Sequence, residues 1–349
     1  MNRLRFAFRP LLLVALLTAG CGKDPVRPLP SPPTFLPPAI DDYPVWAHNG
    51  TAIAYFRFVA SADGPPGIYL VSKWGGTPRL ISAGFFGQFR FSPDDQRLLA
   101  VSPDLQLAVI DVCTGQVAQP FYTDNLVDGP DWSPDGTKIV YLKGGPNPGE
   151  PPDSGGIHIF DTAAGTDRPL VAGGSVVQGI RPLWLPSGEI SFVGMDGSGR
   201  QRLAITDGAG SGLRVLYRSR RSNSFWLLTW YSRPSTASAG VLFSDNDAPP
   251  FGGIFLIRTD GSVLTRMPPF RPYVLGYGHE AFSPDGEEWV HHGFDPVDSL
   301  DVLFVSRMGD LNGASSRQLT TYSPPPNASA KPVASRSWSP SGRTLPLLP

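Results

Sequence analysis

Three observations predict an all-β fold for this sequence. Short apolar runs rich in β-branched and aromatic residues recur along the chain. Glycine and proline, 39 of each, lie mostly between these runs, and one turn motif returns seven times. Short strands separated by turn residues are typical of an all-β chain. The 349 residues, 41% of them hydrophobic, can bury a sizeable core.

The best-formed copy of the turn motif occupies residues 131–142 and reads Asp-Trp-Ser-Pro-Asp-Gly-Thr-Lys-Ile-Val-Tyr-Leu. Pro134 presets φ at the first central position of a type I turn, Asp135 takes the second, and Gly136 closes it. Ile139-Val140-Tyr141 then supplies the residues of a half-buried strand. The motif therefore predicts a strand end, a tight turn and a second strand.

The copies of this motif recur at a nearly regular spacing, 41 to 56 residues apart. They open at Trp46, Phe91, Trp132, Trp184, Trp230, Phe282 and Trp338. Each copy except the last is followed by a second apolar segment and usually by a third, such as Gly67–Val71 and Arg79–Ile81. Four strands per repeat at this period describe a β-propeller blade, because packing blades face to face round an axis buries both faces of each sheet.

The repeat resembles that of the TolB-like propellers. The resemblance rests on Trp/Phe-Ser-Pro-Asp-Gly, an Ile-Tyr-x-x-Asp type strand and an Arg-x-Leu-Thr type strand, and it covers residues 43–349. The copies at Trp132 and Phe282 keep the full Ser-Pro-Asp-Gly, whereas Asp95 replaces glycine in the second copy and Ser341 replaces aspartate in the seventh. The fold implied is a propeller of four-stranded blades.

We expect six blades, because six complete four-strand units are followed by only half a unit. Propellers commonly close when one terminus completes a blade begun by the other, so residues around Trp338 are expected to pack near the Trp46 repeat. The alternative is seven blades with the last incomplete. Two prolines in residues 343–349 fit a central strand poorly and argue against an elaborate seventh blade.

The N-terminus predicts a bacterial lipoprotein signal peptide over residues 1–20. Three arginines precede the short apolar run of residues 11–17, which is too short to span a bilayer, and small residues then lead to Cys21. This arrangement resembles the lipoprotein processing box, so Cys21 is the expected lipid attachment site, with an ordinary signal peptide as the alternative. Gly22 after the cysteine favours the outer membrane, facing the periplasm.

Residues 21–42 are expected to form the lipidated cysteine and a proline-rich linker before the propeller. Seven prolines fall between Pro25 and Pro38. A polyproline chain rises about 3.1 Å per residue, so the linker could hold the next domain roughly 60 Å from a membrane. Plain disorder without a spacing role is the alternative.

Composition argues against several functions. A net charge of −1 with 17% charged residues provides no basic field for nucleic acid. If Cys21 carries lipid, Cys113 is the only other cysteine, so no internal disulfide is expected. Cys113 follows a strand-like run, and a small buried or edge residue is the expected role rather than a reactive thiol.

Candidate chemistry is sparse, and the sequence predicts no catalytic, cofactor-binding or metal-binding residue. His291-His292 would point to opposite faces of a strand, and His48, His158 and His279 lack ligand spacing. Two groups offer oxygens for calcium without the spacing of a calcium loop, namely Asp245-Asn246-Asp247 and Asp124-Asn125 with Asp128.

Two further segments are expected to be loops. Gly173-Gly174-Ser175-Val176-Val177 lacks the closing glycine of a hydrolase nucleophile elbow and is expected to be a turn between blades. The basic segment Tyr217-Arg218-Ser219-Arg220-Arg221, with Arg214 before it, is expected to be a solvated inter-blade loop rather than a surface for lipid or an acidic partner.

These observations favour a non-catalytic binding module over an enzyme. The first hypothesis is a membrane-anchored propeller that presents its loops to an envelope protein or a small ligand, with the ligand and its binding residues unknown. The alternative is an enzyme with a site in the propeller channel, acting on a sugar or another small molecule. That site would require acidic or histidine side chains from several repeats to converge at the axis.

Overall fold

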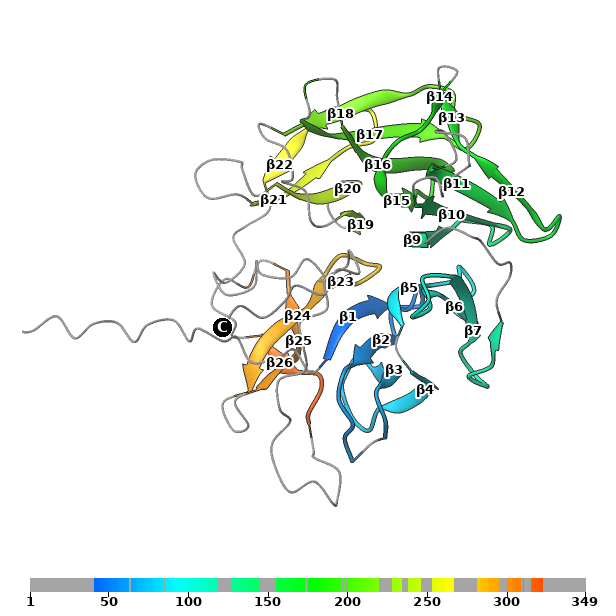
Figure 1. Ribbon diagram of the computed structural model, residues 1–349. Helices are drawn as coiled ribbons and strands as arrows, with labels where there is room; N and C mark the ends of the chain where they lie inside the picture. Colours follow the sequence, from blue (N-terminus) through cyan, green and yellow to red (C-terminus); the bar gives the residue numbers. More distant parts are fainter. Residues whose placement is uncertain are drawn as a thin grey trace, which may run out of the picture. The chain divides into compact units, whose positions relative to one another are not determined.

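The computed structural model is built from β-strands (Figure 1). It describes residues 41–62, 64–84, 86–118, 127–144, 155–172, 175–195, 198, 200–219, 228–233, 238–245, 253–266, 281–295, 300–308, 310 and 315–322. Within these ranges the structure contains no helix, and therefore no helix long and apolar enough to cross a membrane.

Strands β1–β12 form the first three blades in chain order. Blade 1 consists of β1 (Asp41–Trp46), β2 (Ala52–Arg57), β3 (Gly67–Ser72) and β4 (Arg79–Ala83). Blade 2 consists of β5 (Gly87–Phe91), β6 (Arg97–Val101), β7 (Leu107–Asp111) and β8 (Val117–Ala118). Blade 3 consists of β9 (Val127–Trp132), β10 (Lys138–Lys143), β11 (Gly156–Asp161) and β12 (Thr166–Pro169).

The hairpin β13 (Val171–Ala172) and β14 (Ser175–Val176) precedes the remaining three blades. Blade 4 consists of β15 (Ile180–Trp184), β16 (Glu189–Met195), β17 (Gln201–Asp207) and β18 (Arg214–Arg218). Blade 5 consists of β19 (Leu228–Arg233), β20 (Ser238–Asp245), β21 (Gly253–Ile257) and β22 (Leu264–Arg266). Blade 6 consists of β23 (Ala281–Phe282), β24 (Glu288–Asp295), β25 (Leu300–Arg307) and β26 (Arg317–Gln318).

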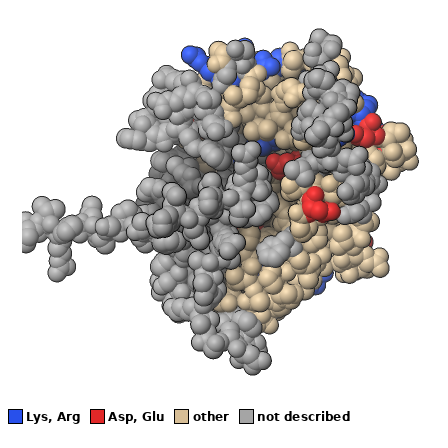
Figure 2. Space-filling view, in the orientation of Figure 1, with Lys and Arg blue, Asp and Glu red and all other residues tan. Residues whose placement is uncertain are grey.

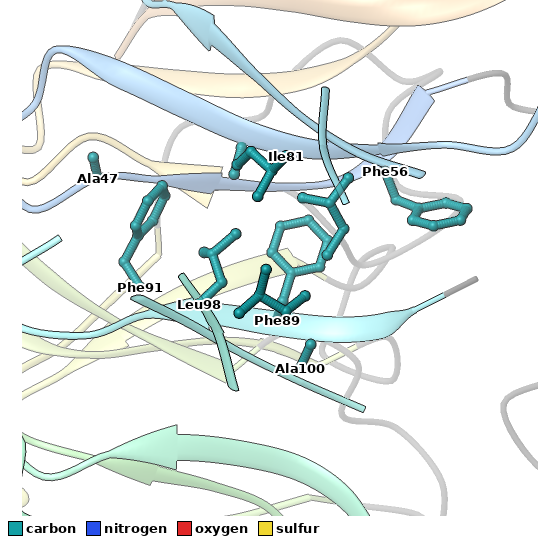
Figure 3. Close-up of a cluster of buried hydrophobic side chains, with 10 residues drawn as sticks. Ala47, Phe56, Ile81, Phe89, Phe91, Leu98 and Ala100 are labelled. Atoms are coloured by element: carbon teal, nitrogen blue, oxygen red, sulfur yellow. The ribbon is translucent and has the colours of Figure 1, made fainter. Parts of the chain in front are cut away.

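Buried apolar side chains join every blade to the next and join blade 6 back to blade 1. Figure 3 shows the seam between blades 1 and 2, where Phe56 and Ile81 face Phe89 and Leu98. Representative pairs at the other five seams are Val101 and Trp132, Ile159 and Phe192, Ile205 and Phe243, Leu256 and Trp289, and Val305 and Tyr55. Each large side chain buried in this way contributes about 1.5–3 kcal/mol. The ring is therefore a six-bladed propeller, as the repeat predicted.

The Ser-Pro-Asp-Gly copies form the turns between the first and second strands of their blades. In blade 3, Gly136 N donates to the Ser133 carbonyl oxygen at 2.8 Å, and Gly136 has φ of 69°. Asp135 Oδ1 accepts hydrogen bonds from Ser133 Oγ at 2.6 Å and Thr137 N at 3.0 Å. Asp135 therefore supports the turn.

Asp95, which replaces the motif glycine in blade 2, links two blades. It keeps a left-handed backbone, with φ of 58°. Its carboxylate accepts hydrogen bonds from His48 N at 2.7 Å and Asn49 N at 3.0 Å, in the corresponding turn of blade 1. A departure from the motif thus supplies a contact between neighbouring turns that glycine could not make.

The motif tryptophan of blade 3 packs between blades. Trp132 is 4% exposed and belongs to the apolar cluster between blades 2 and 3. The Arg97 guanidinium lies 4.9 Å from the centre of its ring, a cation–π distance. Trp132 therefore serves the packing of blade 2 against blade 3.

The described blades differ in one respect from the expected layout, because β1 begins at Asp41, two residues inside the predicted linker. Among the described residues, each blade takes its four strands from one continuous stretch of chain. The seventh motif copy, at Trp338, lies outside the described residues.

Strands β13 and β14 pair antiparallel on either side of Gly173-Gly174, where the turn was predicted and which lie outside the described residues. The hairpin touches blade 4 at the turn between β17 and β18. A Cβ added at Gly210 would overlap the Val171 carbonyl oxygen, and Gly210 has φ of 85°. Gly212 in the same turn also has positive φ, 66°, but a Cβ there would meet no atom within 4 Å.

We therefore expect Gly210→Ala to destabilise the protein more than Gly212→Ala. Both variants incur a left-handed backbone cost of about 1 kcal/mol. Only Gly210→Ala must also displace the hairpin, which adds about 1–3 kcal/mol. Urea unfolding of the two variants measures this difference, and equal losses of stability would show that the hairpin does not press on the turn.

Candidate binding site in the channel

The first strand of each blade lies innermost in the ring. β1, β5, β9, β15 and β19 contact one another in succession, and β1 also contacts β23. Because the strands run up and down, the turns that follow these first strands gather at one end, here called the turn end. The first strands begin at the opposite end, here called the inlet end.

Three of these inner strands share a backbone irregularity at the inlet end. Tyr43 in β1, Gly129 in β9 and Arg181 in β15 have φ of 52°, 54° and 54°. Each is followed by a proline, and the pairing register shifts at each of these places. A left-handed backbone costs a non-glycine residue roughly 1–2 kcal/mol, so Tyr43 and Arg181 are held there against a local preference.

Side chains of both charges gather next to these bulges. The channel cluster, as named here, consists of Tyr43, Arg90, Asp128, Asp131 and Arg181, which come from the inner strands of blades 1–4. Each member lies within electrostatic reach of at least one other member. Figure 2 shows acidic and basic side chains close together near the middle of the face in view, among uncharged atoms.

Burial sets the protonation of this cluster. Burial raises the pKa of Asp131 to about 6, although Arg90 and the Trp184 backbone N–H oppose the shift. The pKa of Asp128 is also raised, and that of Arg181 is lowered, in both cases chiefly by burial. Burial disfavours the charged form of each group, and the neighbouring opposite charges do not fully compensate.

Hydrogen bonds fix the two carboxylates, whereas the two guanidiniums make few hydrogen bonds to the described residues. Asp131 Oδ2 accepts from Trp184 N at 2.7 Å, across the seam between blades 3 and 4, and Asp128 Oδ1 accepts from Gly129 N at 2.8 Å. Arg90 Nη1 donates to its neighbouring carbonyl, Phe89 O, at 3.1 Å. Among the residues that the structure describes, the Arg181 guanidinium has no hydrogen-bond acceptor and no carboxylate oxygen within 4.0 Å.

Asp245, which the sequence offered as a calcium ligand, lies outside the channel cluster and forms a buried hydrogen bond within the fold. It is fully buried at the end of β20, and its Oδ2 accepts a hydrogen bond from Tyr217 Oη at 3.0 Å. Asn246, Asp247, Asp124 and Asn125 lie outside the described residues, whereas Asp128 belongs to the channel cluster. Within the described ranges, no three histidine, cysteine or acidic side chains are grouped as metal ligands.

The histidines that the structure describes have separate local roles. His291 contacts Ser306 Oγ through Nε2 at 2.8 Å and stacks on Trp289 at 4.2 Å between ring centres. His158 Nδ1 and Tyr141 Oη both bond the carboxylate of Asp167, at 3.0 and 2.9 Å. His48 Nδ1 lies 3.0 Å from Asp95 Oδ1, and His279 lies outside the described residues.

The basic segment that includes Arg214 takes part in contacts between blades. Arg214 Nη2 donates to Glu189 Oε1 at 2.7 Å and to Thr259 O at 2.9 Å, which ties blade 4 to blade 5. Arg220 and Arg221 lie outside the described residues.

Cys113 is exposed in the turn after β7, so it is not the small buried residue that one interpretation expected.

The sequence analysis did not predict that the residues of the channel cluster lie together, although a local sequence pattern marks the bulges beside them. Tyr43, Gly129 and Arg181 each stand before a proline and three residues before the motif tryptophan. This x-Pro-x-Trp pattern marks the bulge. It does not reveal which side chains from other repeats face it.

Comparison with known proteins gives a fold but no family. No family model matches the chain, and no curated protein matches it in sequence. TolB from Acinetobacter baumannii is similar in structure, with a TM-score of 0.57 and 12% identity over 78% of this chain and 65% of that one. This chain therefore matches less than two thirds of that protein's length.

Two further solved structures are similar. TolB from Agrobacterium tumefaciens gives a TM-score of 0.53 and 18% identity, over 77% of this chain and 91% of that one. An oligogalacturonate lyase in complex with manganese gives a TM-score of 0.50 and 15% identity, over 78% and 75%. At these identities the similarity concerns the fold alone, and it confirms the predicted TolB-like propeller.

The raised pKa of Asp131 predicts how stability depends on pH. A carboxyl group that titrates near 6 when folded and near 3.8 when unfolded stabilises the fold below about pH 4, and this contribution is lost as the pH rises through 6. The free energy of unfolding should therefore fall by about 2–3 kcal/mol between pH 4 and 7. Urea unfolding across this range measures the decline, and Asp131→Asn should reduce it to the part that the raised pKa of Asp128 contributes.

Asp135 provides the matched control, four residues away in the same blade. Its hydrogen bonds with Ser133 and Thr137 lower its pKa to about 2, so its contribution is present above pH 4 and is lost only as the pH falls through 2. Asp135→Asn should leave the decline between pH 4 and 7 intact. If Asp131→Asn also leaves it intact, Asp131 is not the buried group responsible.

Proposed function

We propose that this protein is a binding module of the bacterial cell envelope. Its role is non-catalytic. Lipidated Cys21 anchors it to the outer membrane, facing the periplasm, and residues 21–42 space the propeller from that membrane. The propeller binds an envelope protein or a small ligand at the inlet end of its channel.

The observation that carries the proposal is the backbone conformation of Arg181 together with the lack of a hydrogen-bond acceptor for its guanidinium. Its backbone is left-handed at a position where blade 3 has Gly129, and its guanidinium has no acceptor among the described residues. Strain of this kind persists where surrounding structure enforces it, and it concentrates at functional sites. A half-buried guanidinium without an acceptor among the described residues can gain hydrogen bonds when a ligand supplies the acceptors.

The sequence supports the anchor and the spacer. An apolar run ending in small residues before Cys21 is the feature that resembles a lipoprotein processing box. Each buried CH₂ of an acyl chain contributes about 0.8 kcal/mol, so the several chains of a lipoprotein cysteine would hold the protein stably. The linker joins the propeller at the start of β1, which lies at the inlet end.

An enzyme in the same channel is the second candidate, and Asp131 favours it. A carboxyl group with a pKa of about 6 can donate and accept protons near neutral pH, as a general acid or base must. One similar structure is a lyase for oligogalacturonate, a sugar acid polymer. Turnover of a sugar that is abolished by Asp131→Asn would establish this alternative.

Crosslinking of intact cells, followed by separation of membrane and soluble fractions, tests the proposal. The full-length chain should appear in the membrane fraction, and Cys21→Ser should move it to the soluble fraction. If the variant stays membrane-bound after its signal peptide is cleaved, the lipid anchor is wrong.

The same experiment tests the inlet end. Mass spectrometry of the crosslinked material and native mass spectrometry of the purified protein should detect a bound protein or small molecule. Arg181→Gly should lose it, whereas Arg214→Ala, which alters a contact between blades 4 and 5, should keep it. Equal retention by both variants would place binding away from the channel.

A further inference from the structure

The channel cluster contains unused hydrogen-bond donors and unused acceptors side by side. The guanidinium of Arg181 is unsatisfied among the described residues, and the one hydrogen bond of Arg90 is to its neighbouring carbonyl. Asp128 and Asp131 each accept a hydrogen bond from a backbone N–H through one carboxylate oxygen. A carboxylate can accept about four hydrogen bonds and a guanidinium can donate five, so both kinds of group retain free capacity.

These opposite charges do not satisfy each other directly. They are close enough to alter one another's titration, Arg181 with Asp128 and Arg90 with Asp131. Yet in the described part of the chain no nitrogen of either guanidinium lies within 4.0 Å of either carboxylate. The guanidiniums and carboxylates are therefore not paired with each other directly.

We propose that the channel binds a saccharide, whose hydroxyl groups bridge Asp128 and Asp131 to Arg90 and Arg181. The inference rests on the proposed binding function and specifies its ligand. A hydroxyl group donates one hydrogen bond and accepts others, so a pair of neighbouring sugar hydroxyls can donate to a carboxylate and accept from a guanidinium.

The charge balance selects a polyhydroxyl ligand over an ion. The cluster holds two carboxylates and two guanidiniums, and a simple anion or cation would satisfy one sign while leaving the other desolvated without a partner. Hydroxyl groups fill both sets of sites without changing the net charge.

The backbone at Arg181 argues against a channel that holds only water. Water could fill the same sites, but it would not require an arginine where glycine adopts the same φ without strain. Arg181→Gly therefore removes the guanidinium and relieves the backbone at once. If the side chain serves a ligand, this variant loses binding while its melting temperature stays the same or rises.

Isothermal titration calorimetry of the full-length chain in detergent tests the proposal, with cellobiose, N,N′-diacetylchitobiose and digalacturonate as probes. At least one probe should bind saturably below 10 mM. Arg181→Gly and Asp131→Asn should each weaken that binding at least tenfold, and Arg214→Ala and Asp135→Asn should leave it unchanged. Binding by digalacturonate alone would identify an acidic sugar, and binding by the other two a neutral one.

Two outcomes would overturn the inference. One is the absence of saturable binding for all three sugars, and the other is sugar binding that Arg181→Gly leaves intact. A large fall in the melting temperature of Arg181→Gly would also contradict it, because the guanidinium would then serve the fold. If crosslinking captures a protein through the inlet end while no sugar binds, the saccharide is wrong and the binding module stands.

Discussion

The ring depends on the contact between blade 6 and blade 1, because these are the neighbours that do not follow one another along the chain. The Arg57 guanidinium binds the Asp41 carboxylate at 2.7 and 2.9 Å, and both side chains are fully buried. The same guanidinium donates to the Thr321 carbonyl oxygen at 3.0 Å, just after blade 6. A buried ion pair is tolerated only when its remaining donors are filled, so this contact binds the last part of the ring to the first.

Closure at this seam also sets the geometry of the channel. Asp41 begins β1, and the bulge at Tyr43 follows two residues later, so the strand that completes the ring is the strand that carries part of the channel cluster. Around the axis, the bulges at Gly129 and Arg181 touch, with the Arg181 Cα 3.4 Å from a Cβ built on Gly129. The inner strands can hold strained residues because the apolar seams between blades outweigh the local cost.

The blades could be predicted from sequence because each motif copy carries its own turn and strands. Trp132 and Asp135 act within one repeat and its seam, so their roles follow from local chemistry. The channel cluster could not be predicted in the same way, because Arg90, Asp128 and Arg181 come from different repeats and only the ring brings them together. The Arg57 contact to Thr321 joins residues 264 positions apart, outside every motif copy.

Hydrogen exchange of Arg57→Met, measured by mass spectrometry, tests ring closure most directly. Removing one partner of a buried ion pair costs about 3–5 kcal/mol, and here the loss should open the seam. We expect faster exchange in β25 of blade 6 as well as in β1 and β2 of blade 1, with blades 3 and 4 less affected. Faster exchange confined to blade 1 would contradict it, because the ion pair would then stabilise only its own blade.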